Sequence, residues 1–266
     1  MTRIHHLSCA SMCPGAGRVG LVPRELVAHC LLVESGDRLV LVDTGFGVAD
    51  VEQFSARLGP VVRMLGMQRD RELPAVNQLR AMGHSPDDVT DIVLTHLDLD
   101  HAGGLPDFPR ARVHVHAREL AAAREPSARE RMRYVPAHWE HGPRWQEHTE
   151  GGDTWMGFAS AQAVGEDVLM VPLHGHSQGH CGVAVRRPSG GWLLHAGDAY
   201  FHAGDKERPR HCPPGLRAFQ RLVAIDNGAR RHNLARLQEL HRDRSGEVTV
   251  FSAHDKSELD ALRAQG

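Results

Sequence analysis

The stretch His96-Leu97-Asp98-Leu99-Asp100-His101-Ala102-Gly103-Gly104 places four side chains that can bind a metal ion within six residues. It follows Asp91-Ile-Val-Leu-Thr95, whose apolar centre predicts a buried strand. Imidazole nitrogens and carboxylate oxygens are the ligands that a zinc-like cation takes where no thiolate is offered. Gly103 and Gly104 are expected to let the chain turn sharply beside the ions, because glycine carries no Cβ. The stretch therefore predicts a metal site at a strand end.

Three further candidate ligands lie downstream, each at the end of an apolar run of the strand type: His176, Asp198 and His254. Side chains placed at strand ends are held rigidly, which a preorganised site requires. We therefore expect these residues to join the first four in one site.

The pattern of the remaining chain predicts a layered α/β protein with mostly non-parallel sheets. Strands are expected where short apolar runs end at turn residues, and helices where apolar residues recur at helical spacing. The expected strands are 26–34, 38–43, 91–95, 112–116, 167–173, 182–187, 191–196 and 247–252. The expected helices are 71–82, 117–124, 215–224, 229–242 and 256–264. No Pro- or Gly-rich linker divides the chain, so residues 1–266 are predicted to form one domain.

Residues 125–150 differ from the rest of the chain. They are polar and rich in Arg, His and Trp, with prolines at 126, 136 and 143 and no apolar periodicity. We interpret them as an inserted segment or lid, a mobile cover that shapes substrate choice without supplying metal ligands. His138 and His141 are accordingly expected to face substrate or to pack within this cover.

Composition limits the partners and the compartment. Of the 266 residues, 41% are hydrophobic, and the formal net charge is -2, so no strong field attracts nucleic acid or an anionic membrane. No run approaches the roughly 20 apolar residues that span a bilayer, and the start lacks the apolar run of a signal peptide. The five cysteines form no CxxC pair, which favours a reducing compartment. We expect a cytoplasmic protein whose partner is a small molecule, with a homodimer left open.

The order of these motifs resembles the metallo-β-lactamase superfamily. His96-x-Asp98-x-Asp100-His101-x-Gly103-Gly104, followed by the three downstream ligands, is similar to that family's pattern His-x-His-x-Asp-His, His, Asp, His. The Asp43-Thr44-Gly45 loop after the second expected strand is also typical of the family. The resemblance implies a four-layer αββα sandwich with two metal ions at one edge of the facing sheets.

The resemblance also implies how the ligands are shared. By position, it assigns His96, Asp98 and His176 to a first metal, Asp100, His101 and His254 to a second, and Asp198 to a bridge between them. The departure is Asp98, where the family usually has a second histidine. A carboxylate there favours harder ions, so Mn²⁺ or Fe²⁺ become alternatives to the Zn²⁺ that the family implies. The flavodiiron branch is similar in placing a carboxylate at this position.

The implied reaction is hydrolysis. A hydroxide held between two cations would attack a carbonyl carbon, or a phosphorus, while Asp100 orients it and passes its proton to the leaving group. Gly197-Asp198-Ala199 and the Ser252-Ala-His-Asp255 ending resemble N-acyl-homoserine lactonases, so opening of a lactone or cleavage of an ester is the leading expectation. The alternatives are thioester hydrolysis of the glyoxalase II type, using arginines of 230–244, and a diiron redox protein.

Several neighbouring residues are weaker candidates. Lactonases usually place a substrate-contacting Tyr where this chain has Phe201, so Tyr200 is expected to take that catalytic contact if the strand register allows it. Cys9 and Cys13 are expected in a loop after the first strand, where the fold borders the active site, although a buried or inert thiol is the alternative. The histidines at 174 and 180 are candidates for supporting the metal ligand between them.

Overall fold

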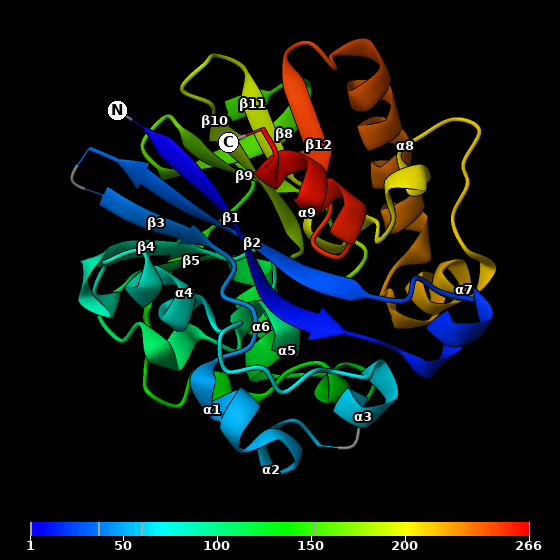
Figure 1. The fold of residues 1–266 in the computed structure, drawn as a ribbon. Helices are drawn as coiled ribbons and strands as arrows, with labels where there is room; N and C mark the ends of the chain where they lie inside the picture. The colour runs from blue at the N-terminus through cyan, green and yellow to red at the C-terminus, as the bar shows by residue number, and fades with distance from the viewer. Residues whose placement is uncertain (1, 37, 60, 152, 266) are drawn as a thin grey trace.

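The computed structural model describes residues 2–36, 38–59, 61–151 and 153–265, which form two mixed six-stranded sheets packed face to face (Figure 1). The N-terminal sheet has the order β1-β2-β3-β4-β5-β6 and the C-terminal sheet β12-β11-β10-β9-β8-β7. The first sheet consists of β1 (Arg3–Met12), β2 (Leu26–Ser35), β3 (Arg38–Val42), β4 (Val89–Val93), β5 (Arg112–His116) and β6 (Arg144–His148). The second consists of β7 (Asp153–Trp155), β8 (Phe158–Val164), β9 (Val168–Pro172), β10 (Cys181–Arg186), β11 (Trp192–His195) and β12 (Val248–Phe251).

Strand direction brings the candidate ligands to one edge. β3 to β6 run parallel to one another in the first sheet, and β11 runs parallel to β12 in the second. The remaining pairs are antiparallel, so the expectation of mostly non-parallel pairing holds for the second sheet but not for the first, in which β3 to β6 pair in parallel. Because β11 and β12 run parallel, their carboxyl ends lie at the same edge of the second sheet. The end of β4 meets that edge through His96, whose Nε2 lies 3.7 Å from Oδ2 of Asp198, a residue that follows β11.

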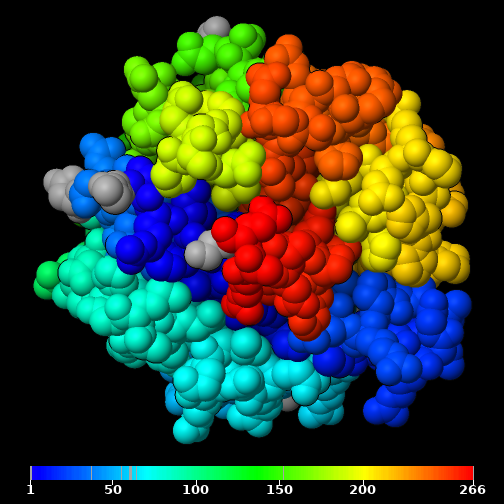
Figure 2. Space-filling model, turned by 45° about the horizontal axis from the view of Figure 1, so that its top comes forward, coloured from blue at the N-terminus to red at the C-terminus, as the bar shows by residue number. Residues whose placement is uncertain are grey.

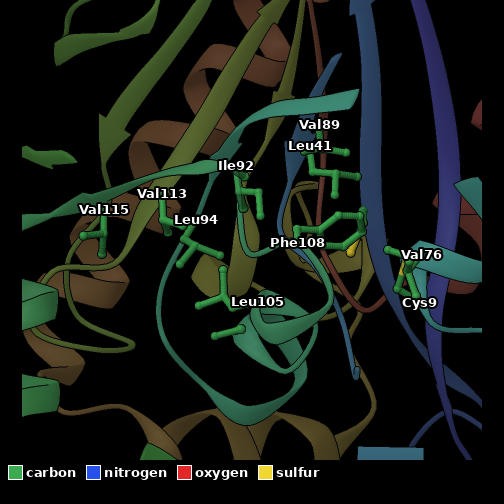
Figure 3. Close-up of a cluster of buried hydrophobic side chains, with 14 of the residues drawn as sticks. Cys9, Leu41, Val76, Val89, Ile92, Leu94, Leu105, Phe108, Val113 and Val115 are labelled. Carbon is green, nitrogen blue, oxygen red and sulfur yellow. The ribbon is translucent and has the colours of Figure 1, made fainter. Parts of the chain in front are cut away.

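Alternating side chains bury both faces of each sheet. On β2, Leu31 and Val33 point into the core between the sheets, whereas Cys30 and Leu32 point to the outer face. This alternation follows from the two-residue repeat of a strand. The outer core of the first sheet continues through β4 and β5 to Leu105 and Phe108, which pack against these strands (Figure 3).

Helices cover the outer faces and complete four layers. α4 (Ala75–Ala81) and α6 (Ala117–Arg124) pack on the first sheet, and α8 (Asn227–Asp243) packs on the second. α9 (Lys256–Arg263) lies against the N-terminal strands (Figure 2). There Arg263 Nε donates to the His6 carbonyl oxygen at 2.8 Å. The other helices are α1 (Val48–Glu52), α2 (Phe54–Leu58), α3 (Val61–Leu65), α5 (Leu99–Ala102) and α7 (Pro214–Val223). The predicted αββα sandwich is confirmed, and in the described part of the chain no helix is long and apolar enough to cross a membrane.

The segment 125–150 is divided into two parts. Its second part contains β6, which extends the first sheet beside β5, so this part belongs to the sheet and not to a cover. Its first part, near 129–133, borders the cavity described below. His138 does not face that cavity: it is fully buried, with Nε2 3.0 Å from an Asp50 carboxylate oxygen. The mobility of the first part stays a prediction.

Candidate metal centre

Strand ends and the turn after β4 bring the seven predicted ligands into two adjoining groups. Within each group, one possible ligand atom per residue lies within 4.8 Å of the others. The first group is His96, Asp98, His176 and Asp198, and the second is Asp100, His101 and His254. The grouping matches the division that the family resemblance implies. Binding of metal by these residues stays a prediction.

Asp98 joins the first group through one carboxylate oxygen. Its Oδ2 lies 3.0 Å from His176 Nε2 and 3.5 Å from His96 Nε2. Burial alone would raise the pKa of Asp98, but the Arg133 guanidinium and the nearby imidazoles hold it well below its usual range. The side chain is therefore an anion directed at two ligand nitrogens.

Asp198 contacts both groups. Its Oδ2 lies 3.3 Å from His176 Nε2, while its Oδ1 lies 3.3 Å from His101 Nε2 and 3.0 Å from His254 Nε2. Burial would raise the pKa of this carboxyl, yet the surrounding imidazoles, His254 first, keep it well below the ordinary value. Oδ1 thus faces the second group, whereas Oδ2 contacts the first group and also lies 3.2 Å from His254 Nε2 of the second. A carboxylate that reaches both groups has the placement of a bridging ligand.

The donor atoms fit divalent cations. His96 Nε2, His101 Nε2 and Asp198 Oδ1 are buried next to one another's side chains, but among the described residues none of these atoms has a partner in hydrogen-bond geometry. His101 Nδ1 contacts Asp43 Oδ2 at 2.8 Å, and His254 Nδ1 contacts the Val27 carbonyl oxygen at 2.7 Å. A ring that donates from Nδ1 has, in its neutral form, its lone pair on Nε2, so Nε2 is the atom of each ring that would bind a metal ion. Buried orphan acceptors of this kind are costly unless a cation satisfies them.

Asp43 holds the second group in place from behind. Its two oxygens accept from His101 Nδ1, the Thr95 backbone N–H and the Thr95 hydroxyl at 2.7–2.8 Å. The residue has φ 56, a left-handed conformation that non-glycine residues rarely adopt. The next glycine, Gly45, is required because a Cβ there would lie 2.2 Å from the Cys9 Cβ. The tight Asp43-Thr44-Gly45 turn thus places a carboxylate against a ligand ring.

His180 and Glu119 support the loops that carry the ligands. His180 Nδ1 donates to the Leu173 carbonyl oxygen at 3.0 Å, and its Nε2 accepts from the Asp198 backbone N–H at 2.8 Å. Burial lowers the pKa of His180 well below its usual value, consistent with a neutral ring in these two roles. Glu119 on α6 accepts from the Leu97 and Gly179 backbone N–H groups at 3.1 and 2.9 Å, which ties together the loops on either side. His180 therefore supports the site, as considered from the sequence.

Gly103 and Gly104 are required for a different reason from the one predicted. Both have ordinary negative φ angles, so no sharp glycine-only turn is present. A Cβ on Gly103 would lie 2.4 Å from Asp50 Oδ2, and one on Gly104 would lie 2.9 Å from the Thr44 Cβ. The two glycines let α5 approach the Asp43–Gly45 turn closely.

A cavity of about 350 Å³ opens onto both groups. Its lining includes carboxylates and imidazoles from both groups, two arginines, and an apolar wall that the sequence did not predict. The polar lining residues are Asp98, Asp100, Arg129, Arg133, His176, Asp198 and His254, and the apolar ones are Met12, Leu26, Leu65, Leu99, Met132, Phe201, Phe219, Leu222 and Val223. The ligands thus lie beside a space suited to a largely apolar molecule.

The structure contradicts the catalytic contact predicted for Tyr200. Its side chain is fully buried away from the cavity, with the hydroxyl donating to Glu258 Oε1 at 3.1 Å. Extended backbone at Tyr200 sends the next side chain to the opposite face, so Phe201 faces the site. The Phe201 ring centroid lies 4.6 Å from that of His254 and 5.8 Å from that of His176. At the position where lactonases usually have a tyrosine hydroxyl, this chain therefore has the phenyl ring of Phe201, and Tyr200 does not take its place.

Changing Tyr200 to Phe is expected to lower stability and spare activity. The variant loses one buried hydrogen bond to a carboxylate, about 1.5–3 kcal/mol, whereas kcat/KM should stay within about twofold. Thermal unfolding and steady-state kinetics measure the two effects. Phe201→Tyr is the matched variant, because it adds a hydroxyl to the cavity wall and should change KM. A more than tenfold loss of kcat in the first variant, without loss of stability, would restore a catalytic role to Tyr200.

Other sequence candidates lie elsewhere. Cys9 is a buried residue inside β1, not in a loop after it, and Cys13 is exposed just beyond the strand; neither lines the cavity. A third cluster of possible ligands, His116, Glu150 and His174, lies apart from the cavity lining. The His116 Nδ1 accepts the Arg118 backbone N–H at 3.2 Å, so the neutral ring carries its proton on Nε2 and offers no lone pair there. We assign no ion to this cluster.

Comparison with known proteins agrees with this geometry. A sequence profile described as the Metallo-beta-lactamase superfamily matches residues 23–244. The chain is 40% identical over 257 residues to a probable metallo-hydrolase of Mycobacterium tuberculosis, covering 95% of this chain and 80% of that protein. It is 28% identical over 196 residues to an N-acyl homoserine lactonase of Agrobacterium fabrum, covering 70% of this chain and 63% of the relative.

Solved structures show the same fold. A mutant of the Bacillus thuringiensis protein AiiA, crystallised with N-decanoyl-L-homoserine at its active site, superposes with a TM-score of 0.75 at 20% identity, covering 97% of this chain and 95% of that one. A probable metal-dependent hydrolase from Staphylococcus aureus gives a TM-score of 0.70 at 17% identity, with coverages of 96% and 90%. From the sequence match and the fold, the chain belongs to the metallo-β-lactamase superfamily.

Proposed function

We propose that this chain is a metal-dependent hydrolase that opens the ring of a lactone carrying an apolar acyl chain. The observation that carries the proposal is the cavity, in which ligands from both groups meet an apolar wall. Lactonases among its relatives, and the N-decanoyl-L-homoserine bound in the superposable B. thuringiensis structure, support the same substrate class. The proposal predicts that the ring lies over the ligands and the chain along the wall.

The residues around the cavity have separable roles. Two divalent ions, Zn²⁺ by family, would be held by the seven ligands and would lower the pKa of a water molecule and polarise the substrate carbonyl. Asp100 lines the cavity beside His254, with Oδ2 3.8 Å from the Nε2 of that ring. Its carboxylate is placed to take a proton from the attacking water and pass it to the leaving alkoxide.

The apolar wall binds the substrate and excludes water. Phe201 and Phe219 pack with ring centroids 6.0 Å apart on one side of the cavity, and Leu222 and Val223 from α7 line it nearby. Apolar side chains around the reacting groups remove bulk water, which strengthens the electrostatic interactions inside. The same side chains offer an acyl chain a favourable surface.

Thioester hydrolysis of a large anionic substrate fits less well. The arginines of 230–244 lie on α8 or just beyond it, and none of them lines the cavity. The cavity does contain Arg129 and Arg133, but both guanidinium groups are bound to carbonyl oxygens, and Arg133 also to Asp98. Of these two arginines, only Arg129 is therefore not already paired with a carboxylate, which leaves one guanidinium in the cavity for a glutathione-type substrate.

A series of N-acyl homoserine lactones with chains from short to long tests the proposal. We expect kcat/KM to rise roughly fourfold for each added methylene until the wall is covered, because each buried methylene contributes about 0.8 kcal/mol. Chelation should abolish the activity, and added Zn²⁺ or Mn²⁺ should restore it. A glutathione thioester and a phosphotriester serve as comparison substrates.

Two results would contradict the proposal. One is faster turnover of the thioester or phosphotriester than of the best lactone. The other is a lactone activity that does not depend on chain length, which would show that the apolar wall does not bind the chain. Phe219→Ala provides a check on the wall, since it should flatten the chain-length dependence while leaving metal content unchanged.

A further inference from the structure

Arg133 contacts Asp98, the residue at which this chain departs from the family's usual histidine. Arg133 Nη1 donates to Asp98 Oδ1 at 3.0 Å, and Nη2 donates to the Val223 carbonyl oxygen at 2.7 Å. The two side chains are only 10% and 14% exposed. The contact thus joins the segment near 129–133 to the candidate metal centre and to the end of α7.

The contact divides the two oxygens of Asp98 between different partners. Oδ1 accepts from Arg133, whereas Oδ2 is the atom 3.0 Å from His176 Nε2 and 3.5 Å from His96 Nε2. An Arg guanidinium can bind both oxygens of a carboxylate, but here it leaves one of them facing the ligand nitrogens. Arg133 therefore fixes the orientation of the carboxylate and selects the oxygen that a metal ion would meet.

Arg133 also balances charge. A carboxylate in place of a histidine adds one negative charge to a buried group that already contains Asp198. Arg133 supplies one positive charge within hydrogen-bond distance, so the pair together is as neutral as the histidine it replaces. Either member alone would be a largely buried charge without its partner, which is strongly unfavourable.

We propose that Arg133 is the positioning residue of the first metal site, which holds Asp98 as a ligand through Oδ2 alone and offsets its charge. Asp98 and Arg133 then act as one unit that takes the place of a single histidine. The inference rests on the metal centre of the proposed function. The inference does not depend on which substrate the protein hydrolyses.

Arg129 provides a matched control. It belongs to the same segment and lines the same cavity, and its Nη2 donates to the Leu222 and Ala224 carbonyl oxygens at 2.9 and 2.7 Å. Arg133 donates to the carbonyl between them, so both arginines anchor the segment to the end of α7. Only Arg133 contacts Asp98, and a comparison of the two separates anchoring from metal-site positioning.

The test is a metal titration of the full-length apoprotein with Zn²⁺ against a competing chelator. We expect Arg133→Met to weaken the affinity of one of two ions by about 10- to 100-fold, the usual effect of losing a residue that orients a ligand. Arg133→Lys should recover part of the loss, and Arg129→Met should leave the zinc affinity within about threefold. Circular dichroism and thermal unfolding of each apoprotein show whether the variant is folded.

A double-mutant cycle with Asp98→His decides whether Arg133 acts on the metal site through Asp98 or only anchors the segment near 129–133. Asp98→His alone leaves the guanidinium beside a cation site without its partner, so its zinc affinity should be low. Adding Arg133→Met removes that lone charge, so the double variant should bind zinc more tightly than Asp98→His alone. The effect of Arg133→Met thus reverses sign between the two backgrounds.

Three results would overturn the inference. Unchanged zinc affinity in a folded Arg133→Met variant would remove any role at the site. Arg133→Met could instead lower the zinc affinity equally in the wild-type and Asp98→His backgrounds, or Arg129→Met could lower it as much. Either result would show that Arg133 only anchors the segment. Wild-type protein that takes up no metal would overturn the proposed function along with this inference, whereas the first two results leave the proposed function intact.

Discussion

Replacing Asp198 with asparagine is expected to remove most of the proposed hydrolase activity and at least one of the two metal ions that we propose the site binds. Asp198 is the residue whose two oxygens reach both ligand groups, at 3.0–3.3 Å from His254, His101 and His176. An amide has no charge, and only one of its two terminal atoms can accept a metal ion. A metal ion contributes several kcal/mol to the stabilisation of a hydrolytic transition state, so kcat/KM should fall on the order of a thousandfold.

Elemental analysis after reconstitution with excess Zn²⁺, paired with lactone kinetics, measures both effects. Asp260→Asn is the control, because Asp260 is an exposed α9 residue that pairs with Lys256 at 2.6 Å and lies outside the cavity lining. It undergoes the same chemical change without touching a ligand. A full complement of two ions and near-wild-type kinetics in Asp198→Asn would rule out the bridging assignment.

Local patterns explain why much of the fold could be predicted. The bounds of β5 and α6 coincide with the predicted ranges, and those of β9, β10, β11 and α7 lie within about one residue of them. In each of these elements the apolar residues repeat with the period of a strand, two residues, or of a helix, 3.6 residues, within one short stretch of sequence. The four ligands of the His96–His101 stretch are close together in the sequence, so their proximity could be predicted without knowledge of the tertiary packing. For the distant His176, Asp198 and His254, the order of the family motif supplied the missing information.

Features that depend on long-range packing escaped prediction. β6 has a largely exposed, polar sequence, and only its pairing with β5 makes it a strand. The difference between Tyr200 and Phe201 depends on a single-residue register that the sequence does not determine. Arg133 meets Asp98 across 35 positions, and nothing in the polar segment 125–150 distinguishes it from the neighbouring arginines. Short-range patterns determine elements, whereas such contacts depend on how the elements pack.

Changing Asp43 to Asn is expected to weaken the proposed second metal site without disturbing the backbone. Asparagine tolerates the left-handed conformation that residue 43 adopts at φ 56, so the turn should survive. The carboxylate of Asp43 accepts three hydrogen bonds, but the amide of asparagine has a single oxygen. One of the carboxylate positions must therefore be taken by an NH₂ group.

The Thr95 backbone decides which position that is. Its N–H is a fixed donor to Oδ1 at 2.7 Å and cannot turn away, so the amide oxygen is expected to remain there. The NH₂ group then faces His101 Nδ1, which must accept a hydrogen bond and move the ring proton to Nε2. A protonated Nε2 cannot bind the second metal ion. His101 is therefore still present in the variant, but its tautomer prevents it from binding the metal ion.

Zinc titration of the apoprotein and lactone kinetics test this argument. We expect the affinity of the weaker-binding ion to fall by about 10- to 100-fold and activity by at least about a hundredfold. Asp91→Asn is the matched control, since Asp91 is also a buried carboxylate that contacts a histidine, His114, at 2.9 Å, but lies away from the cavity lining. Asp91→Asn therefore measures the loss of stability that comes from replacing a buried carboxylate with an amide. If both variants lost zinc affinity equally, the effect would come from destabilised packing, and the control of the His101 tautomer by Asp43 would have to be abandoned.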